Sequence, residues 1–287
     1  MSKENKIAVI VPFFKREELT ALCFKHLLRQ SKKYNFDVFV SGDNKKIVPK
    51  DFIFIEAPNI PVGNKNNILL QETLEYDGVM IVGSDDFLSD SIFELYKTID
   101  LTQKVYYGFN NLHIYSCHNN KITSDFPYTK NGNTVGVARL WSKPTLEAMN
   151  YKLWTSFKNR GLDSDSKTRM LSKGIKEITI DYGEHFILDV KQGYNITNPA
   201  IVNTGYVDCD ISIIKEKLGV ISNDILSLKP LDVKQIYSKR IMRDRGNKIK
   251  VIYSKDSNGI LKGTIKMLDR KIADQVIKIG IVKEVHE

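Results

Sequence analysis

The chain has 287 residues, of which 42% are hydrophobic and 27% are charged, and its formal net charge is +9. This composition is ordinary for a folded globular protein and excludes a chain that is disordered throughout. The length suits one large α/β domain with a small appendix. The early apolar run Ile7–Phe14 is too short for a membrane span and lacks the flanks of a signal peptide, so we expect no integral membrane segment.

The charge is distributed unevenly along the chain. Residues 232–287 contain 14 lysines and arginines against 7 acidic residues, a net charge of +7, whereas residues 1–231 carry +2. This asymmetry favours a polyanionic partner for the C-terminal segment, and a solvated lysine-rich surface is the alternative. Cys23, Cys117 and Cys209 are scattered and cannot all pair, which favours a reducing, cytoplasmic setting.

Strands and helices alternate through the first hundred residues. The continuous apolar run Ile7–Val11 is typical of a strand buried on both faces of a parallel sheet. Further strands are expected at 36–40, 52–55 and 78–82, and helices at 17–32, 64–75 and 89–99. This order predicts an α/β fold with a mostly parallel central sheet and helices on both faces. Such sheets bind ligands at the carboxyl ends of their strands, which makes the loops after the first, second and fourth strands the candidate site.

The rest of the chain is less regular. We expect strands at 105–109 and 113–116 and helices at 140–149 and 163–173. Two nearly alternating runs, 249–253 and 261–267, flank Ser257-Asn258-Gly259, a strong hairpin signal, and 276–285 is a further strand candidate. The predicted organisation is therefore a main domain at 1–205, a helical connector at 206–231 and a small basic β-rich domain at 232–287.

Two carboxylates follow the fourth predicted strand, in Gly83-Ser84-Asp85-Asp86. Carboxylate oxygens hold Mg²⁺ or Mn²⁺ well, and such an ion neutralises a diphosphate as it leaves a sugar. Because the pair comes at a strand's carboxyl end, an ion there would lie in the ligand crevice. The alternative is an acidic helix N-cap before the helix expected at 89–99.

Four segments in order carry a resemblance to a known family. They are Val11-Pro12-Phe13-Phe14-Lys15-Arg16, Val38-Phe39-Val40-Ser41-Gly42-Asp43-Asn44, Gly63-Asn64-Lys65-Asn66-Asn67 and Val79-Met80-Ile81-Val82-Gly83-Ser84-Asp85-Asp86. Together, over about residues 5–100, they resemble the entry loop, the second strand with its terminal acid, the donor-pocket stretch and the Asp-x-Asp metal strand of the GT-A glycosyltransferases of inverting family 2. The resemblance implies a GT-A fold and transfer of a sugar from a nucleotide-sugar donor, with a UDP-sugar expected.

The resemblance also implies which residues bind the donor and its metal. Donor contacts are expected from Pro12, Phe13, Phe14, Arg16, Asp43, Lys65, Asn67, Ser84, Asp85 and Lys191. A divalent Mn²⁺ or Mg²⁺ is expected on Asp85 with support from Asp86, because Gly83 stands where the family has its first acid. A third ligand or phosphate partner is expected among His185, Asp189 and Lys191. We take His185 as the metal ligand, although a lone histidine is more often structural.

A second site signal lies in Gly161–Met170. In the family a Glu-Asp pair opens a helix near this point and its aspartate is the general base, so Asp163 takes that role by resemblance, with Leu162 in place of the glutamate. Removal of the acceptor proton is what an inverting transfer needs. The alternative is that Asp163 only caps the helix. Trp141, Trp154 and Asp165 are the candidate acceptor contacts, and a core role for the tryptophans is the alternative.

Three hypotheses for the acceptor and the basic tail remain open. The first, which we favour, is DNA with hydroxymethylated pyrimidines, as in bacteriophages that glycosylate their genomes in the host cytoplasm. The tail would bind duplex phosphates and the target base would be flipped towards Asp163. The second is a bacterial surface polysaccharide or teichoic-acid precursor. The third is a non-catalytic nucleic-acid-binding protein on a degenerate GT-A fold, against which Asp85, Asp86 and Asp163 argue.

Overall fold

The computed structural model describes residues 4–57, 60–124, 132–192, 206–231, 248–253, 265–269 and 282–284. The chain forms two compact units, Met1–Leu231 and Asp232–Glu287. Within the described residues, no helix combines the length and the apolarity that crossing a bilayer requires.

The first unit is built on a seven-stranded sheet with the strand order β10-β6-β9-β4-β1-β2-β3. Its strands are β1 (Ile7–Pro12), β2 (Asp37–Ser41), β3 (Ile53–Phe54), β4 (Gly78–Ile81), β6 (Val105–Phe109), β9 (Leu140–Ser142) and β10 (Lys176–Ile180). Neighbours pair in parallel except where β9 lies antiparallel between β4 and β6. The predicted fold class, an α/β fold with a mostly parallel central sheet, is confirmed.

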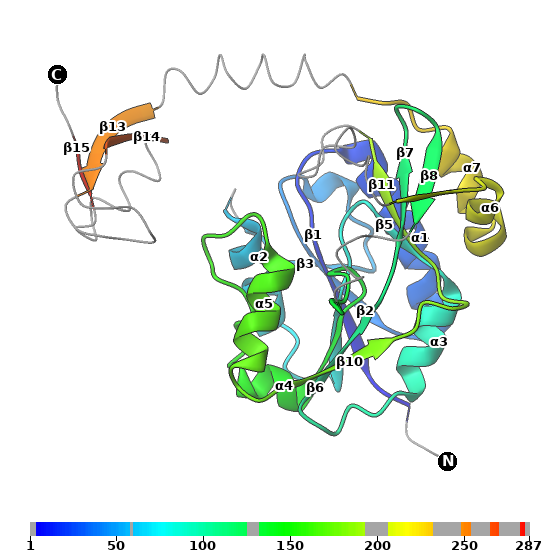
Figure 1. The fold of residues 1–287 in the computed structure, drawn as a ribbon, viewed down its shortest axis with the longest axis horizontal. Coiled ribbons are helices and arrows are strands. Elements are labelled where there is room, and N and C mark those ends of the chain that lie inside the picture. The colour runs from blue at the N-terminus through cyan, green and yellow to red at the C-terminus, as the bar shows by residue number, and fades with distance from the viewer. Residues whose placement is uncertain are drawn as a thin grey trace. The chain divides into compact units, whose positions relative to one another are not determined.

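Helices cover both faces of this sheet (Figure 1). They are α1 (Glu17–Tyr34), the short 3₁₀ helix η1 (Lys45–Ile47), α2 (Val62–Gln71), α3 (Asp90–Thr98), α4 (Lys143–Ala148), α5 (Leu162–Leu171), α6 (Ser212–Leu218) and α7 (Ile221–Leu226). Two separate hydrophobic clusters result, one containing buried residues of α1, α3, α6 and α7, the other those of α2, α4 and α5. The apolar run Ile7–Val11 sends alternate side chains into the two clusters, which is why it is apolar at every position.

A second, five-stranded sheet has the order β12-β8-β7-β11-β5. Its strands are β5 (Asp86–Leu88), β7 (His113–Ser116), β8 (Lys121–Ser124), β11 (Ile187–Lys191) and β12 (Val207–Cys209). The short strand β5 begins in the loop after β4, so the second sheet starts where the central strand of the first one ends. The antiparallel pairing of β5 with β11 sets Asp86 opposite Asp189.

Two segments differ from the sequence prediction. The helix expected at 140–149 is strand β9 followed by α4, because Ser142 ends the strand and its side chain accepts a hydrogen bond from Thr145 N as an N-cap. The connector expected at 206–231 contains strand β12 as well as two helices. Ile214 and Ile225 of those helices are fully buried in the cluster that contains α1, so this segment packs as part of the first unit.

In the second unit the described strands form an antiparallel sheet of the order β14-β13-β15. The strands are β13 (Lys248–Tyr253), β14 (Ile265–Asp269) and β15 (Val282–Glu284). The register pairs Ile252 with Ile265, and this is the pair nearest the expected hairpin turn. The turn itself, Ser257-Asn258-Gly259, lies outside the described residues.

Candidate active site at the carboxyl edge of the central sheet

The carboxyl ends of β1, β2 and β4 lie at one edge because these strands are parallel. The loop after β1 is bonded to the end of β2, since Phe13 N donates to Ser41 O at 2.9 Å. Gly42 begins the second loop, and a Cβ there would overlap the Phe13 ring. The third loop follows Val82, whose N–H donates to Ile10 O at 3.1 Å. Three segments that are distant in sequence therefore meet at this edge.

Three carboxylates gather at this edge. Asp85 lies in the turn after β4, Asp86 begins β5, and Asp189 lies across from Asp86 on β11. One oxygen atom of each lies within 4.8 Å of one oxygen of both others. Side-chain oxygens grouped in this way are the ligands that Mg²⁺ and Mn²⁺ take in proteins. We call this group the aspartate cluster.

Two cations are paired with the aspartate cluster. The Arg16 guanidinium donates to Asp85 Oδ2 at 2.6 Å and to Ser84 Oγ at 3.2 Å. Lys191 Nζ lies 2.5 Å from Asp189 Oδ2. Both cationic side chains are largely buried. The edge thus holds three carboxylates and two cations in a small, mostly dry volume, where charges interact more strongly than in water.

The three carboxyl groups do not share one protonation preference. Burial alone would raise the pKa of Asp85, but Arg16 and Lys191 outweigh it and hold that pKa below its usual value. Burial, with Asp189 and Asp85 nearby, raises the pKa of Asp86 well above normal. Burial likewise raises the pKa of Asp189, although Lys191 opposes the shift. Asp86 and Asp189 therefore lack the nearby positive charge that would return their pKa values to normal.

A divalent cation fits this environment. Asp189 Oδ1 is buried and has no hydrogen-bond partner among the described residues, and a buried acceptor in this condition costs stability unless something binds it. The donor set consists only of hard oxygen atoms. A cation would supply both the missing partner for Asp189 and the positive charge that Asp86 lacks.

Packing leaves no room for a side chain at position 83. Asp86 folds back so that its Oδ2 accepts from Gly83 N at 2.7 Å. A Cβ on Gly83 would overlap that oxygen and would lie 3.1 Å from Asp85 Oδ1. The Asp86 carboxylate therefore takes up the space in which a side chain at position 83 would begin.

The loop that carries Arg16 is held in an unusual backbone conformation. Lys15 and Arg16 have φ values of 58° and 52°, in the left-handed region that ordinary residues seldom adopt. The Lys15 N–H donates to Asp43 Oδ1 at 3.1 Å, and the Arg16 side chain is tied to Asp85. Strain of this kind persists only where neighbouring contacts enforce it, and it clusters at functional sites.

The predicted donor residues of the first and third segments lie around this loop. Lys65 Nζ donates to Phe13 O at 3.2 Å and lies over the Phe14 ring, 5.5 Å from its centroid. Burial lowers the pKa of Lys65, against the attraction of Asp43. Pro12 is half-buried at the end of β1. Phe14 is half-buried, whereas the Phe13 ring is in the core and leaves only its backbone for a ligand.

Asn67 is buried and bonded within the protein. Its Nδ2 donates to Trp154 O at 2.7 Å and its Oδ1 accepts from Trp154 N at 3.2 Å. This pair of bonds fastens α2 to the segment after α4. Both ends of the amide are thus occupied, and Asn67 fixes the position of α2, which also carries Lys65.

Asp163 lies in the first turn of α5 and reaches the same edge. A Cβ on Gly136 would overlap the Asp163 carboxylate, so the two segments are in direct contact. The loop that contains Gly136 is bonded to the end of β4, because Ala138 N donates to Ile81 O at 2.8 Å. The carboxylate reaches solvent, yet the surrounding protein desolvates it enough to raise the pKa of Asp163, against the effect of Arg139.

Arg139 holds the first turn of α5 in place through hydrogen bonds. It is fully buried, and its Nη1 donates to Asp163 O at 2.9 Å and to Ser166 Oγ at 3.3 Å. Its remaining bonds go to Thr134 Oγ1 and Thr134 O. A buried guanidinium with this many donors occupied locks the loop before β9 to the start of α5, and so orients Asp163.

Four residues that were predicted to contact the acceptor or the metal lie in other surroundings. Trp141 and Trp154 are buried against each other in the core, with ring centroids 5.3 Å apart, so neither can floor an accessible acceptor site in this conformation. Asp165 accepts from Thr155 N at 2.7 Å and pairs with Lys158. His185 Nδ1 lies 3.1 Å from Ser91 Oγ and its ring packs on Phe109. The third member of the aspartate cluster is Asp189, whose polar position inside the apolar strand β11 was the available sequence signal.

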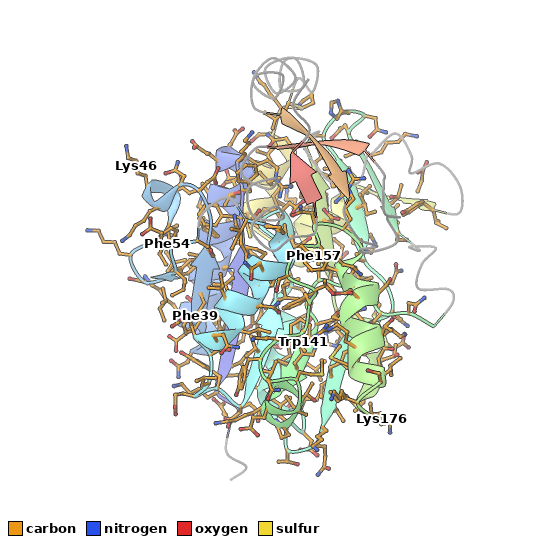
Figure 2. All side chains as sticks on the ribbon, turned by 90° about the vertical axis from the view of Figure 1, so that its left-hand side faces the viewer. Phe39, Lys46, Phe54, Trp141, Phe157 and Lys176 are labelled. Atoms are coloured by element: carbon orange, nitrogen blue, oxygen red, sulfur yellow. The ribbon has the colours of Figure 1, made fainter. Side chains whose placement is uncertain are left out.

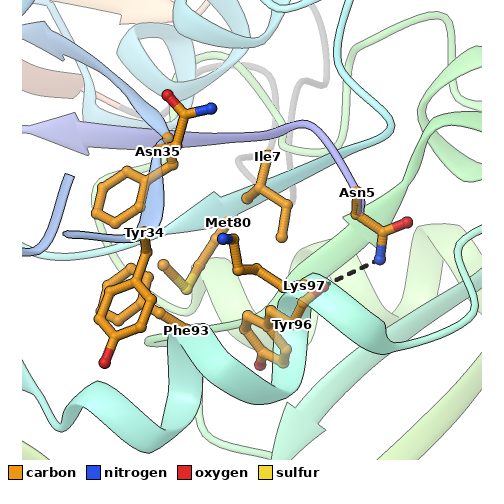
Figure 3. Close-up of a pocket in the computed structure, with 9 residues that line it drawn as sticks. Asn5, Ile7, Tyr34, Asn35, Met80, Phe93, Tyr96 and Lys97 are labelled. Atoms are coloured by element: carbon orange, nitrogen blue, oxygen red, sulfur yellow. Dashed lines mark hydrogen bonds between the residues drawn. The ribbon is translucent and has the colours of Figure 1, made fainter. Parts of the chain in front are cut away.

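Two hollows lie away from this edge. The one in Figure 3 has a volume of about 10 Å³ and is lined by residues such as Tyr34, Met80 and Phe93, which leaves room for no ligand. The other, of about 430 Å³, includes Lys104 and Lys176 at the starting ends of β6 and β10. It therefore lies at the opposite edge of the sheet from the aspartate cluster.

No protein-family model matches the sequence, and no curated protein matches it. The chain is similar to a Drosophila beta-1,4-galactosyltransferase 7 mutant in complex with manganese, UDP-Gal and xylobiose, at 16% identity over 92% of this chain and 94% of that one, with a TM-score of 0.43. It is similar to a mannosyltransferase of Pyrobaculum calidifontis in complex with GDP-Man and Mn²⁺, at 13% identity over 70% of this chain and 60% of that one, with a TM-score of 0.47.

A nucleotidyltransferase is among the similar structures as well. The inositol-1-phosphate CTP transferase of T. maritima is 10% identical over 80% of this chain and 100% of that one, with a TM-score of 0.46. At these identities and TM-scores, function has to be argued from the residues of the site itself.

Proposed function

We propose that the chain is a glycosyltransferase that uses a nucleotide-sugar donor and a divalent cation. The observation that carries the proposal is the aspartate cluster, paired with Arg16 and Lys191, at the carboxyl edge of a mostly parallel sheet. Such an edge is where open α/β sheets bind nucleotides. Asp163 at the same edge supplies a carboxylate for proton removal.

In this proposal one set of residues binds the diphosphate leaving group, and Asp163 acts on the attacking hydroxyl group. Asp85, Asp86 and Asp189 would hold the cation, which when bound would supply positive charge to the diphosphate. Arg16 and Lys191, which pair with Asp85 and Asp189 in the structure, would turn to the remaining diphosphate oxygens when the donor binds. Asp43, Lys65 and Phe14 flank the nucleoside.

Asp163 acts as the general base. It takes the proton from the acceptor hydroxyl as that oxygen attacks the anomeric carbon of the sugar. The bond from the anomeric carbon to the diphosphate oxygen breaks in the same displacement, so the nucleoside diphosphate leaves with the bonding electron pair. The raised pKa of Asp163 makes it a better proton acceptor than an ordinary aspartate.

We further propose that the acceptor is a hydroxymethylated pyrimidine in DNA. The support is the net charge of +7 in residues 232–287, against +2 in the rest of the chain. A basic unit of this kind binds phosphates without reading sequence, and so could hold duplex DNA near the transferase unit.

The test is transfer and hydrolysis of labelled nucleotide sugars in Mn²⁺ by the full chain. Asp163→Asn is expected to lower transfer to hydroxymethylated DNA about 10²- to 10⁴-fold while donor binding is unchanged. The rate of transfer by wild type should fall on the acid side of its pH profile, with a midpoint above the ordinary pKa of aspartate, because only the ionised carboxylate accepts a proton. This fall should be absent in Asp163→Asn.

Asp208→Asn, at an exposed aspartate of β12, is the matched control and should behave as wild type. A near-normal transfer rate in Asp163→Asn rejects the base assignment. Absence of donor hydrolysis and of transfer to either DNA or cell-wall polymers rejects the transferase itself.

A further inference from the structure

Phe157 is an exposed aromatic side chain beside the candidate active site. It is 64% exposed, and no other phenylalanine, tyrosine or tryptophan among the described residues of the first unit is exposed. It lies in the segment between α4 and α5. Figure 2 shows Phe157 higher in the view than Trp141, with Lys176, where β10 begins, lower still.

The segment that presents Phe157 is held on the side of α5. The Asp165 carboxylate accepts from Thr155 N at 2.7 Å and from Thr155 Oγ1 at 3.1 Å. It also pairs with Lys158 Nζ at 2.6 Å. One carboxylate thus closes the turn around Phe157, so the ring is exposed on a backbone whose conformation is fixed.

The same segment is also held on the side of α2. Gly63 N donates to Lys158 O at 3.0 Å, and Val62 N donates to Asn159 Oδ1 at 2.9 Å. These bonds satisfy two of the free N–H groups of the first turn of α2. Because α2 also carries Lys65 and α5 carries Asp163, the Phe157 segment bridges the donor side and the base side of the site.

The exposed segment that carries Phe157 contains two basic residues, Lys158 and Arg160. Arg160 is exposed and has no ion pair or hydrogen bond within the described part of the chain. The exposed residues 156–160 include no acid, and the nearby Asp165 is already occupied. An exposed ring and an exposed guanidinium three positions apart in one segment match a nucleobase with a neighbouring phosphate. A neutral sugar would leave the guanidinium without a partner.

We propose that Phe157 and Arg160 form an acceptor subsite in which Phe157 stacks on an unpaired nucleobase and Arg160 binds an adjacent phosphate. The subsite rests on the proposed function for its role, because it would hold the acceptor nucleotide beside Asp163. The stacking itself can be measured without any transfer reaction.

The experiment compares two eight-residue probes that carry the same phosphates, oligothymidylate and an abasic oligonucleotide, on the full chain. Wild type should bind oligothymidylate about 5- to 150-fold more tightly than the abasic probe, as stacking of one base predicts. In Phe157→Ala this ratio should fall to near one. Phosphate contacts elsewhere on the chain cancel, because both probes make them.

A fluorescent variant gives a second reading. Phe157→Trp places an exposed indole on the segment, whereas Trp141 and Trp154 are buried. Oligothymidylate should quench the emission of this variant, and maltohexaose should not. The variant should keep the wild-type ratio of affinities for oligothymidylate and the abasic probe. Val220→Ala, at a side chain that is 85% exposed between α6 and α7, is the control and should leave the ratio unchanged.

The outcomes separate this proposal from the transferase proposal. An unchanged ratio in Phe157→Ala, or quenching by maltohexaose in place of oligothymidylate, overturns the nucleobase subsite. The binding ratio is measured without a nucleotide sugar, so it does not depend on donor hydrolysis. If the wild-type protein does not hydrolyse any nucleotide sugar, only the transferase proposal is contradicted.

Discussion

At the scale of single residues, position 83 shows how a departure from a motif can arise from packing. The Asp-x-Asp resemblance expects an acid there, and the sequence has glycine. In the structure the Asp86 carboxylate bends back over Gly83 and bonds its N–H. Asp86 thus occupies the space in which a side chain at 83 would begin, and Asp189 from the neighbouring strand supplies a third carboxyl group.

Gly83→Ala tests this arrangement. The added Cβ would overlap Asp86 Oδ2 and crowd Asp85 Oδ1, so Asp86 has to rotate away. We expect at least a 10-fold loss of Mn²⁺ affinity in a folded protein, because changes to the groups that orient a metal ligand cost about 10- to 100-fold in metal affinity. Isothermal titration with Mn²⁺ alone measures it.

Gly78→Ala is the companion control for Gly83→Ala. Its Cβ would crowd Leu101 at the opposite end of β4, far from the carboxylates. It should lower the unfolding midpoint without changing Mn²⁺ affinity. Equal Mn²⁺ affinity in Gly83→Ala and wild type would show that Asp86 is not a ligand.

At the scale of elements, α1 carries both the apolar face that packs on the sheet and polar groups that hold β5. His26 Nε2 and Gln30 Nε2 each lie 2.8 Å from Leu88 O at the end of β5. Both side chains are buried. The sequence predicts only the helix at 17–32 that contains them, because a periodic pattern gives the face of a helix and not the carbonyl group that this face will contact.

The burial of His26 predicts how stability depends on pH. Burial lowers its pKa from 6.5 to about 4, although the bond to Leu88 O opposes the shift. The unfolded chain therefore binds a proton between pH 6.5 and 4 that the folded chain does not. Stability is complete above 6.5 and is lost as the pH falls towards 4, by up to about 3 kcal/mol.

Urea unfolding from pH 7.5 to 4 checks this contribution. His26→Gln should lose the His26 part of the acid slope, whereas His118→Gln, at an exposed histidine, should keep the wild-type slope. Slopes that are parallel in wild type and His26→Gln over this range would show that His26 is not responsible. Carboxyl groups titrate in all three proteins, so they cancel in the comparison.

At the scale of the whole molecule, charge and fold divide the chain at nearly the same place. The first compact unit ends at Leu231, and the residues after it hold the excess positive charge. The first unit contains the aspartate cluster and Asp163. This division predicts that nucleotide-sugar hydrolysis and duplex binding belong to different units.

Truncation after Leu231 tests that division. Full-length protein should bind duplex DNA with an affinity that falls steeply with salt, by about 10³- to 10⁵-fold from roughly 50 to 200 mM if about 6 to 10 phosphates are contacted. The truncated chain should lose this binding and still hydrolyse the donor, which also verifies its fold. Equal duplex affinity before and after truncation would reject the basic unit as the DNA-binding part.

The sequence by itself determined the parallel order of the first four strands, the helices between them, and the loops at their carboxyl ends. Periodicity and apolar runs are local properties, and parallel pairing then forces those loops to one edge. Asp85 and Asp86 could be named because they directly follow a recognisable strand.

Only the tertiary structure decided which distant residues complete the site. Asp189 joins the cluster through the pairing of β5 with β11, Trp141 and Trp154 pack into the core, and Phe157 reaches solvent because Asp165 closes its turn. Each outcome depends on contacts between segments about a hundred residues apart, or on which face of a loop packs inward. Local sequence patterns carry neither kind of information, since burial and pairing are set by the whole chain at once.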